Sequence, residues 1–388
     1  MRLPAASPAH PDYLILLLTA ALTVVGLIAV WSASFVISLA RFGNPEHYIF
    51  NQLIWCGFGL ALFIAAARTD YLTYKRHALL LMLLTLGALI AVLVVGNEAN
   101  GARRWIGYGP LSFQPAEFAK LTITIYLAAW LGSKGATLRS FEGGFWPFVI
   151  IIAAVGFLVM KQPSLGTTLI IFTIAVTMFF VAGASFKQMF ALAAAGLLAV
   201  AILAAVAGYR LDRVTTFLSP DADPGGKGFQ TQQALVAMGN GGVEGLGLGA
   251  SRGKFFYIPE SHTDGVYAII GEEAGFVGTV VVLLFYVLLM VRGFLVARRC
   301  HDEFGTLVAT GITTWITIQA FLNIAGITSL MPLTGVPLPF LSFGGNALAS
   351  ALLAMGVLMS ISRYGQLHAE RQTEPPRGGR IVRRRAAG

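Results

Sequence analysis

Residues 266–291 read Val266-Tyr-Ala-Ile-Ile-Gly-Glu-Glu-Ala-Gly-Phe-Val-Gly-Thr-Val-Val-Val-Leu-Leu-Phe-Tyr-Val-Leu-Leu-Met-Val291, a stretch long and apolar enough to cross a bilayer as one helix. Similar runs recur along the whole chain of 388 residues. The chain is 56% hydrophobic and 12% charged, whereas soluble domains carry about 25% charged residues. The sequence therefore predicts an all-α polytopic membrane protein and argues against a soluble fold.

Ten transmembrane helices are expected, with a large extracytoplasmic loop between the seventh and eighth. The spans are placed at about 13–37, 47–67, 77–96, 115–133, 145–161, 164–184, 188–208, 266–293, 305–328 and 344–362. The first lacks a small-residue cleavage site and is interpreted as an anchor. Most basic residues face the cytoplasm when both termini are cytoplasmic, so we expect that orientation.

The domain organisation follows from these spans. Residues 1–363 are predicted to form a single transmembrane domain that includes the outer loop at about 209–263, in which Phe229 to Met238 form an amphipathic stretch. Residues 364–388 form a basic cytoplasmic tail, predicted to be disordered and solvated, although this tail could also contact anionic lipid headgroups. Cys56 and Cys300 are interpreted as structural, without a disulfide.

A dense ionisable run, from Lys254 to Glu273, precedes the eighth span. Asp264 lies at the junction of this run with the apolar helix. A carboxylate there is partly removed from bulk water and still open to a substrate from one side, as a proton acceptor for chemistry at a membrane surface requires. Glu260 and His262 lie next to it, although a single loop histidine is weak evidence for a ligand.

Further polar residues border the third and fourth spans. Arg103 and Arg104 lie in the outer loop between them, and Glu117 and Lys120 begin the fourth span. Three residues apart on a helix, Glu117 and Lys120 share a face and can pair. Two interpretations stay open: a structural ion pair, or a pair in which one partner also contacts an anionic substrate.

An irregular segment, residues 334–346, separates the ninth and tenth spans. Its prolines and glycines prevent a regular helix, and Ser342 is expected to line a cavity with them: the residues are Pro337, Pro339, Ser342, Gly344 and Gly345. Non-helical backbone at membrane depth is tolerated where it is buried in protein or lines a cavity, so we expect a re-entrant turn against the cavity that holds Asp264. Gln319 and Asn323 in the ninth span are expected to tie helices together. The glycine run at 239–249 is expected to serve close backbone packing rather than phosphate binding.

Six runs, in this order, resemble the SEDS family of bacterial cell-wall polymerases, which includes FtsW, RodA and SpoVE. They are Asn100-Gly-Ala-Arg-Arg-Trp105, Ser112-Phe-Gln-Pro-Ala-Glu-Phe-Ala-Lys120, Gln162-Pro-Ser-Leu-Gly-Thr167, Tyr257-Ile-Pro-Glu-Ser-His-Thr-Asp264, Gly271-Glu-Glu-Ala-Gly275 and Thr334-Gly-Val-Pro-Leu-Pro-Phe-Leu-Ser-Phe-Gly-Gly345. The Asp264 run looks closer to FtsW than to RodA. Ser164, Gly265-Val-Tyr267 and Phe343 depart from the common family pattern.

This resemblance implies a peptidoglycan glycosyltransferase that polymerises lipid II at the outer face of the bacterial cytoplasmic (inner) membrane. It implies a class B penicillin-binding protein as partner, together with other divisome or elongasome membrane proteins, and no nucleic acid. The essential carboxylate of the family falls on Asp264 and the Glu of its Pro-Glu pair on Glu260. Its basic loop residue falls on Arg103 or Arg104, and its helix-start pair on Glu117 and Lys120.

The reaction that the resemblance implies needs a base for a sugar hydroxyl and cationic help for a leaving lipid pyrophosphate. Asp264 is the candidate base, and Glu260 is the second candidate catalytic residue. The candidate pyrophosphate ligands are basic residues on the outer side: Arg103, Arg104, Lys120, Arg252 and Lys254. A divalent cation (Mg²⁺ or Mn²⁺) could share this task, held by substrate phosphates and Asp264 or Glu260.

Three rival functions stay open from the sequence. A lipid II flippase or transporter would also use ten spans, intramembrane charges and broken helices. The clustering of charged groups near the outer surface favours the polymerase, because a carrier needs a site reachable from both sides. An elongation-type, RodA-like polymerase is the second rival and a purely structural divisome scaffold is the third. A polymerase that acts in cell division is preferred to all three.

Overall fold

The computed structural model describes residues 11–99, 102–107, 112–206, 227–255, 258 and 260–373. Helices dominate this part of the chain: α1 (Tyr13–Phe42), α2 (His47–Arg68), α3 (Leu72–Val95), α4 (Pro115–Leu131), α5 (Trp146–Lys161), α6 (Leu165–Val181), α7 (Phe186–Val206), α9 (Lys227–Gly241), α10 (Val266–Arg299), α11 (Glu303–Ile327) and α12 (Gly345–Thr373). A short hairpin of β1 (Asn97–Ala99) and β2 (Ala102–Trp105) and the turns η2 (Gly135–Arg139) and η3 (Phe141–Phe145) complete it.

Every predicted span coincides with a helix; most ends agree within about five residues, but α10 and α12 continue to Arg299 and Thr373, beyond their predicted ends at residues 293 and 362. Seven of the described helices are long and apolar enough to cross a membrane: α1, α2, α3, α5 with η3, α10, α11 and α12. Helix α6 is apolar but shorter, and α4 and α7 occupy the two remaining predicted positions. The all-α membrane class is confirmed, and the number of ten crossings stays a prediction.

The predicted tail and outer loop are described only in part. Helix α12 continues to Thr373, so the tail expected from residue 364 begins as a helix. The remainder of the tail, residues 374–388, and the first part of the outer loop, residues 207–226, lie outside the described residues. The disorder and lipid contact expected of the tail therefore stay predictions.

Local sequence explains where several helices begin and end. The Asp12 side chain accepts a hydrogen bond from the Ile15 N–H at the start of α1, and Asp302 accepts from two backbone N–H groups at the start of α11. Pro115 occupies the first turn of α4, as its missing N–H allows. Gly43 ends α1 in the left-handed conformation that glycine adopts without strain.

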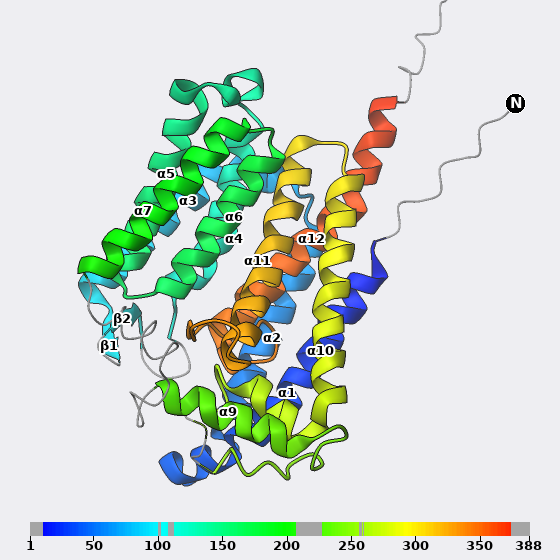
Figure 1. Ribbon diagram of the computed structural model, residues 1–388. Helices are drawn as coiled ribbons and strands as arrows, with labels where there is room; N and C mark the ends of the chain where they lie inside the picture. The colour runs from blue at the N-terminus through cyan, green and yellow to red at the C-terminus, as the bar shows by residue number, and fades with distance from the viewer. Residues whose placement is uncertain are drawn as a thin grey trace, which may run out of the picture.

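The helices form two groups that share α11 and α12 as a common centre (Figure 1). Helices α3 to α7 lie on one side, and α1, α2 and α10 lie on the other. Helix α12 packs along α2, and α11 contacts α4, α6 and α10. In the most hydrophobic windows of α11 and α12, 78% and 83% of residues are buried inside the protein. The protein surrounding these two helices can therefore shelter polar groups from lipid.

Helix α10 is not the regular span that its sequence suggests. Gly275 has φ 67° and ψ −166°, which breaks the helix near its start. Only glycine reaches such a backbone conformation readily. The helix then continues to Arg299, beyond the predicted end of the span at residue 293. The break allows the first turns of α10 to join the surface structure around Asp264.

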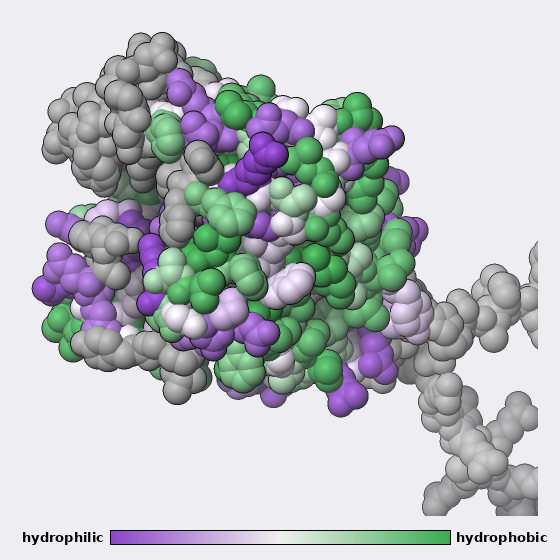
Figure 2. All heavy atoms as spheres, turned by 90° about the horizontal axis from the view of Figure 1, so that it is seen from below, coloured by the Kyte–Doolittle hydropathy of each residue, from purple (hydrophilic) through white to green (hydrophobic). Residues whose placement is uncertain are grey.

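The outer loop contains a helix where the sequence indicated only an amphipathic stretch. Helix α9 packs against α10 and also contacts α11, and Ala234 and Ala237 on it are buried. It lies with the β hairpin at the lower end of the molecule in Figure 1. Figure 2 looks onto this end and shows hydrophilic and hydrophobic side chains intermixed. This mixture suits a surface at the boundary of membrane and water.

Candidate active site

Asp264 lies at the start of α10 and is half-buried. A Cβ placed on Gly335 would lie 3.3 Å from its Oδ2 atom, so the irregular segment before α12 passes directly beside the carboxylate. The Asp264 backbone carbonyl accepts a hydrogen bond of 3.1 Å from Asn323 Nδ2. The expected contact between the re-entrant turn and Asp264 is therefore present.

The re-entrant turn is fixed by polar side chains from the surrounding helices. Gln319 Nε2 donates to the Pro337 carbonyl at 2.8 Å, and Asn323 Nδ2 donates to the Val336 carbonyl at 2.9 Å. The Tyr286 hydroxyl donates to the Pro339 carbonyl. Backbone carbonyls at membrane depth need such partners because no water is available there.

The second half of the turn is held in the same way. Gln52 on α2 donates to the Ser342 carbonyl at 3.2 Å and accepts from the Gly344 N–H at 3.1 Å. The Ser342 hydroxyl accepts from the Leu338 N–H at 2.7 Å. Gly345 packs against the Trp55 ring, where any side chain would collide. These residues therefore support the turn beneath Asp264.

Glu117 and Lys120 form a buried ion pair of 2.8 Å on α4. Lys120 Nζ also donates to Gln319 Oε1 at 2.8 Å and lies 4.8 Å from the centroid of the Trp315 ring. Because Gln319 in turn holds Pro337, the pair is connected to the re-entrant turn. These surroundings favour the structural interpretation of the pair, since the Lys120 side chain is only 1% exposed.

The glycine-rich turn that follows α9 completes the break in α10. The Leu246 and Gly247 N–H groups donate to the Glu272 and Glu273 carbonyls, each at 3.0 Å. In return, the Phe276 N–H donates to the Gly242 carbonyl at 2.9 Å. The turn thus replaces the hydrogen bonds that the helix loses at its break. Close backbone packing is the role that the sequence predicted for these glycines.

The side chain of Glu272 organises the loop segment that follows the glycine turn. It accepts from the Ser251 hydroxyl at 2.5 Å and from the Arg252 and Gly253 N–H groups, each at 3.1 Å. A carboxylate that receives several such donors fixes their geometry. The sequence placed Glu272 and Glu273 within a family-like run but gave them no role. Only the long-range contact with residues 251–254 reveals it.

Lys254 forms a further buried ion pair, with Glu273 at 3.3 Å. Its Nζ atom also donates to Ser32 on α1 and to the Gly249 carbonyl. The side chain is 7% exposed, so these partners enclose it. Lys254, a candidate pyrophosphate ligand from the sequence, therefore ties the loop to α1 and α10 in this structure.

Glu260 and His262 occupy the turn before Asp264. Glu260 is exposed, has φ 52°, and accepts a hydrogen bond of 3.0 Å from the Thr263 hydroxyl. His262 is buried between the rings of Tyr48 and Phe343, with centroids 4.7 and 5.6 Å away. Burial lowers the pKa of His262 to about 4, and the nearby charges of Glu260 and Arg41 oppose each other. At neutral pH this imidazole is uncharged.

The arginines predicted to bind substrate differ in their surroundings. Arg104 donates to the Gln162 and Pro163 carbonyls at 2.9 and 2.6 Å, which ties the β hairpin to the turn between α5 and α6. Arg103 is half-exposed and lies 3.8 Å from Glu98. Arg252 has an exposed side chain. Arg103 and Arg252 therefore present cations to the solvent on the same side as Asp264.

The arrangement can support acid–base chemistry on a bound anionic substrate. A half-buried carboxylate lies beside a hydrogen-bonded turn, and cationic side chains are exposed on the same surface. Among the residues that the structure describes, no group of three His, Cys, Asp or Glu side chains converges to hold a metal ion. The donor set near Asp264 therefore fits a divalent cation only if substrate phosphates supply most of the ligands.

Together these features define a polytopic helical membrane protein with a carboxylate site at one membrane surface, built from a broken helix and a re-entrant turn. Residues 12–367 match the family of FtsW, RodA and SpoVE, described as a cell cycle protein family. The chain belongs to this family.

Named relatives and a solved structure agree with this assignment. The chain is 41% identical to stage V sporulation protein E of Bacillus subtilis (strain 168), over 92% of this chain and 98% of that protein. It is 38% identical to the probable peptidoglycan glycosyltransferase FtsW of Idiomarina loihiensis, over 97% and 92%. It also matches a chain of a peptidoglycan synthase complex that coordinates polymerization and crosslinking, with a TM-score of 0.74, 28% identity and coverage of 92% and 98%.

Proposed function

We propose that this protein is a peptidoglycan glycosyltransferase that polymerises lipid II at the outer face of the cytoplasmic membrane, in cell division. The observation that carries the proposal is the Asp264 carboxylate, half-buried at the start of a broken membrane helix and beside a buried re-entrant turn. The family match and a relative named as a probable glycosyltransferase support the same chemistry.

In the proposed reaction, Asp264 accepts the proton of a sugar hydroxyl on one lipid-linked disaccharide. The hydroxyl oxygen then bonds to the anomeric carbon of a second molecule, and the bond from that carbon to the lipid pyrophosphate breaks. General-base help of this kind contributes about 10²–10⁴ in rate. Glu260 is exposed four residues earlier in the same turn, and its proposed role is to orient the acceptor sugar.

The leaving pyrophosphate needs positive charge, and the exposed Arg103 and Arg252 are the strongest protein candidates. We assign Arg104, Lys120 and Lys254 to positioning, because each is bound to protein groups: backbone carbonyls, Glu117 or Glu273. A Mg²⁺ or Mn²⁺ ion, with Asp264 as its protein ligand, would supply further neutralisation of the pyrophosphate.

The proposed partner is a class B penicillin-binding protein in the same membrane. Both termini of this chain are proposed to lie in the cytoplasm. The similarity to a chain of a synthase complex that couples polymerization to crosslinking supports this proposal. Activity in the complex would then place new glycan strands beside the enzyme that crosslinks them.

The test uses the purified full-length protein in lipid vesicles with labelled lipid II, alone and with the cognate class B penicillin-binding protein. We expect polymer on gels, with more polymer in the complex. A parallel assay measures movement of lipid II between the two leaflets. Transport without polymer in either preparation would contradict the proposal and favour a flippase.

A further inference from the structure

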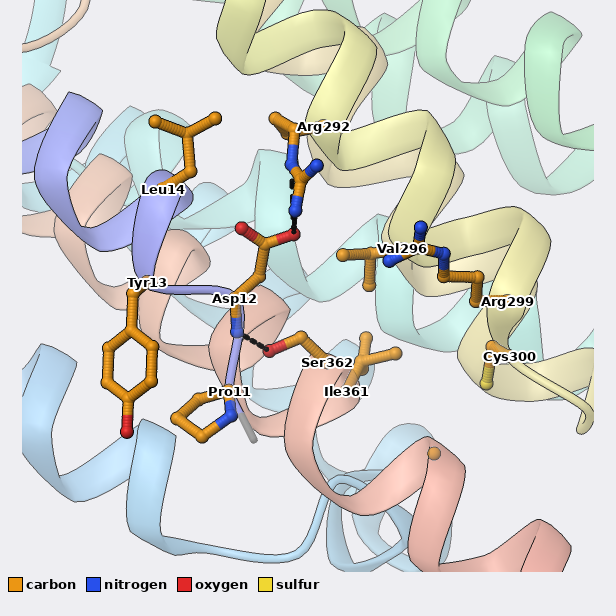
Figure 3. Close-up of a pocket in the computed structure, with 11 residues that line it drawn as sticks. Pro11, Asp12, Tyr13, Leu14, Arg292, Val296, Arg299, Cys300, Ile361 and Ser362 are labelled. Atoms are coloured by element: carbon orange, nitrogen blue, oxygen red, sulfur yellow. Dashed lines mark hydrogen bonds and ion pairs between the residues drawn. The ribbon is translucent and has the colours of Figure 1, made fainter. Parts of the chain in front are cut away.

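A pocket of about 320 Å³ lies at the end of α10 farthest from Asp264, between the start of α1 and residues 361–365 of α12 (Figure 3). After its break at Gly275, α10 runs as a continuous helix from Phe276 to Arg299, a length of about 36 Å that is enough to cross the hydrocarbon core of about 30 Å. The pocket therefore lies at the membrane surface opposite to the candidate active site, and the proposed glycosyltransferase activity does not use it.

One wall of the pocket is polar and already organised. The Arg292 guanidinium binds the Asp12 carboxylate with N–O distances of 2.6 and 3.1 Å. The Asp12 N–H donates to the Ser362 hydroxyl at 3.2 Å. These contacts hold the start of α1 against α10 and α12, and they neutralise Arg292.

Arg299 adds a positive charge to the pocket that no carboxylate in the described residues neutralises. Its side chain is exposed and lines the pocket, two helical turns along from Arg292. Figure 3 shows its guanidinium beside Val296, on the side of the Asp12–Arg292 pair. It forms no hydrogen bond or ion pair with any residue in the described part of the chain. The pocket thus has a net positive charge on one available guanidinium.

The other wall is apolar, and one of its side chains, Leu14, is exposed at the protein surface. Leu14, Val296 and Ile361 line it, and Leu14 belongs to a row of exposed apolar side chains on α1 that includes Leu17. Tyr13 at the rim is 62% exposed, as is common for aromatic residues at the membrane–water boundary. A ligand that fits both walls needs a negative headgroup and a hydrocarbon chain.

We infer that this pocket binds an anionic phospholipid, with the phosphate at Arg299 and an acyl chain along Leu14 and Val296. Guanidinium groups match phosphate oxygens in a two-pronged geometry, and basic pockets between transmembrane helices on the cytoplasmic side suit such headgroups. The bound lipid would contact α1, α10 and α12 beside the Asp12–Arg292 pair, which joins the first two.

The adjacent residues Arg298 and Arg299 provide a matched pair of variants. Both are exposed, but only Arg299 lines the pocket. The full-length wild type, Arg299→Gln and Arg298→Gln are purified, and retained lipid is counted by native mass spectrometry after exposure to phosphatidylglycerol or phosphatidylcholine. Melting temperatures are recorded with the same lipids and with inorganic phosphate alone.

We expect wild type and Arg298→Gln to retain phosphatidylglycerol in preference to phosphatidylcholine, and Arg299→Gln to lose that preference by about fivefold or more. An equal loss in both variants would show only general surface charge, and no loss in either would show that Arg299 binds no lipid; both results overturn the proposal. Equal stabilisation by inorganic phosphate would replace the lipid site with a free-anion site.

Discussion

The described part of the protein buries two lysine–glutamate pairs, one in the membrane-spanning bundle and one beneath the outer loop, and the two are built differently. Glu117 and Lys120 lie three residues apart on a single helix. Lys254 and Glu273 come from different segments and also involve Ser32 on α1. The first pair is a local unit that reaches the site through Gln319. The second joins three segments directly.

This difference predicts different consequences of damage. Removal of one partner of the α4 pair leaves the other charge unpaired among packed helices, so the whole bundle should become less stable. Loss of the loop pair should release residues 245–255 from α10 and leave the bundle intact. The comparison thus separates support of the entire fold from support of the surface that carries the candidate catalytic residues.

The largest effect is expected from Lys120→Met. This change leaves the Glu117 carboxylate buried without its partner, which costs about 3–5 kcal/mol in comparable cases. Lys134→Met is the matched control, because Lys134 lies 4.9 Å from the Trp130 ring centroid but has no carboxylate partner in the described residues. Thermal unfolding in detergent should show a large loss for the first variant and little change for the second.

The charge swap Glu117→Lys with Lys120→Glu sharpens this test. A carboxylate at position 120 would face Gln319 Oε1, which now accepts from both Lys120 and Trp315. We therefore expect the swap to recover only part of the stability and none of the glycan synthesis. Full recovery of both stability and glycan synthesis in a double-mutant cycle would show two things: the order of the two charges along α4 does not matter, and the pair does not depend on Gln319.

His262 provides a buried ionisable group without an opposite charge bound to it. Its pKa of about 4 lies below the usual value of 6.5, because burial disfavours the charged form. The unfolded chain therefore takes up a proton between pH 6.5 and 4 that the folded protein does not. Stability from this group is fully present above pH 6.5 and is lost as pH falls towards 4, on the order of 3 kcal/mol.

The pH prediction is checked by comparing wild type with His262→Phe, which can keep the ring contacts with Tyr48 and Phe343. Carboxylates titrate in both proteins, so the difference between their unfolding curves isolates His262. Identical pH dependence of the two proteins between pH 4 and 6.5 would show that the histidine is protonated in the folded state.

Glu273→Gln should cost less than Lys120→Met, about 2 kcal/mol, because Lys254 keeps the Gly249 carbonyl and the Ser32 hydroxyl as acceptors. Hydrogen exchange should accelerate at residues 245–255 and stay unchanged in α4 and α11. Glu244→Gln, at an exposed glutamate of the same turn, is the control. Equal acceleration throughout the bundle would remove the distinction between the two pairs.

The smallest effect is expected from Gln319→Leu, about 1–2 kcal/mol, because the change removes hydrogen-bond partners but leaves the Glu117–Lys120 ion pair in place. The change removes the donor to the Pro337 carbonyl and one acceptor of Lys120. Since Pro337 lies in the turn beside Asp264, glycan synthesis should fall more than stability does. Activity that follows stability in proportion would show that Gln319 has no positioning role.

Local patterns in the sequence predicted much of this molecule. Apolar runs located the helices, the three-residue spacing indicated the Glu117–Lys120 pair, and prolines with glycines indicated the re-entrant turn. Each of these signals lies within one short segment. The roles of Gln319 and Asn323 could also be predicted from the sequence, because amides inside an apolar helix need hydrogen-bond partners.

Features that depend on contacts between distant segments could not be predicted from the sequence. Gly275 looks like any glycine in an apolar helix, and its break appears only with the glycine turn packed beside it. The Ser32 hydroxyl donates a hydrogen bond to the Glu273 carboxylate, although the two residues are 241 positions apart in the sequence. Arg104 looked like a substrate ligand, and its bonds to two backbone carbonyls come from the turn between α5 and α6.

The central claim is that Asp264 is the base of a glycan polymerase, and Asp264→Asn tests it most directly. The backbone carbonyl of this residue, which Asn323 holds, is unchanged by the substitution, and Asn keeps the side-chain shape. Polymer formation from lipid II by the purified variant with its partner is compared with its melting temperature and partner binding. We predict at least about a 10²-fold loss of polymerisation with unchanged melting temperature and binding; polymerisation at the wild-type rate by this folded variant would contradict the account.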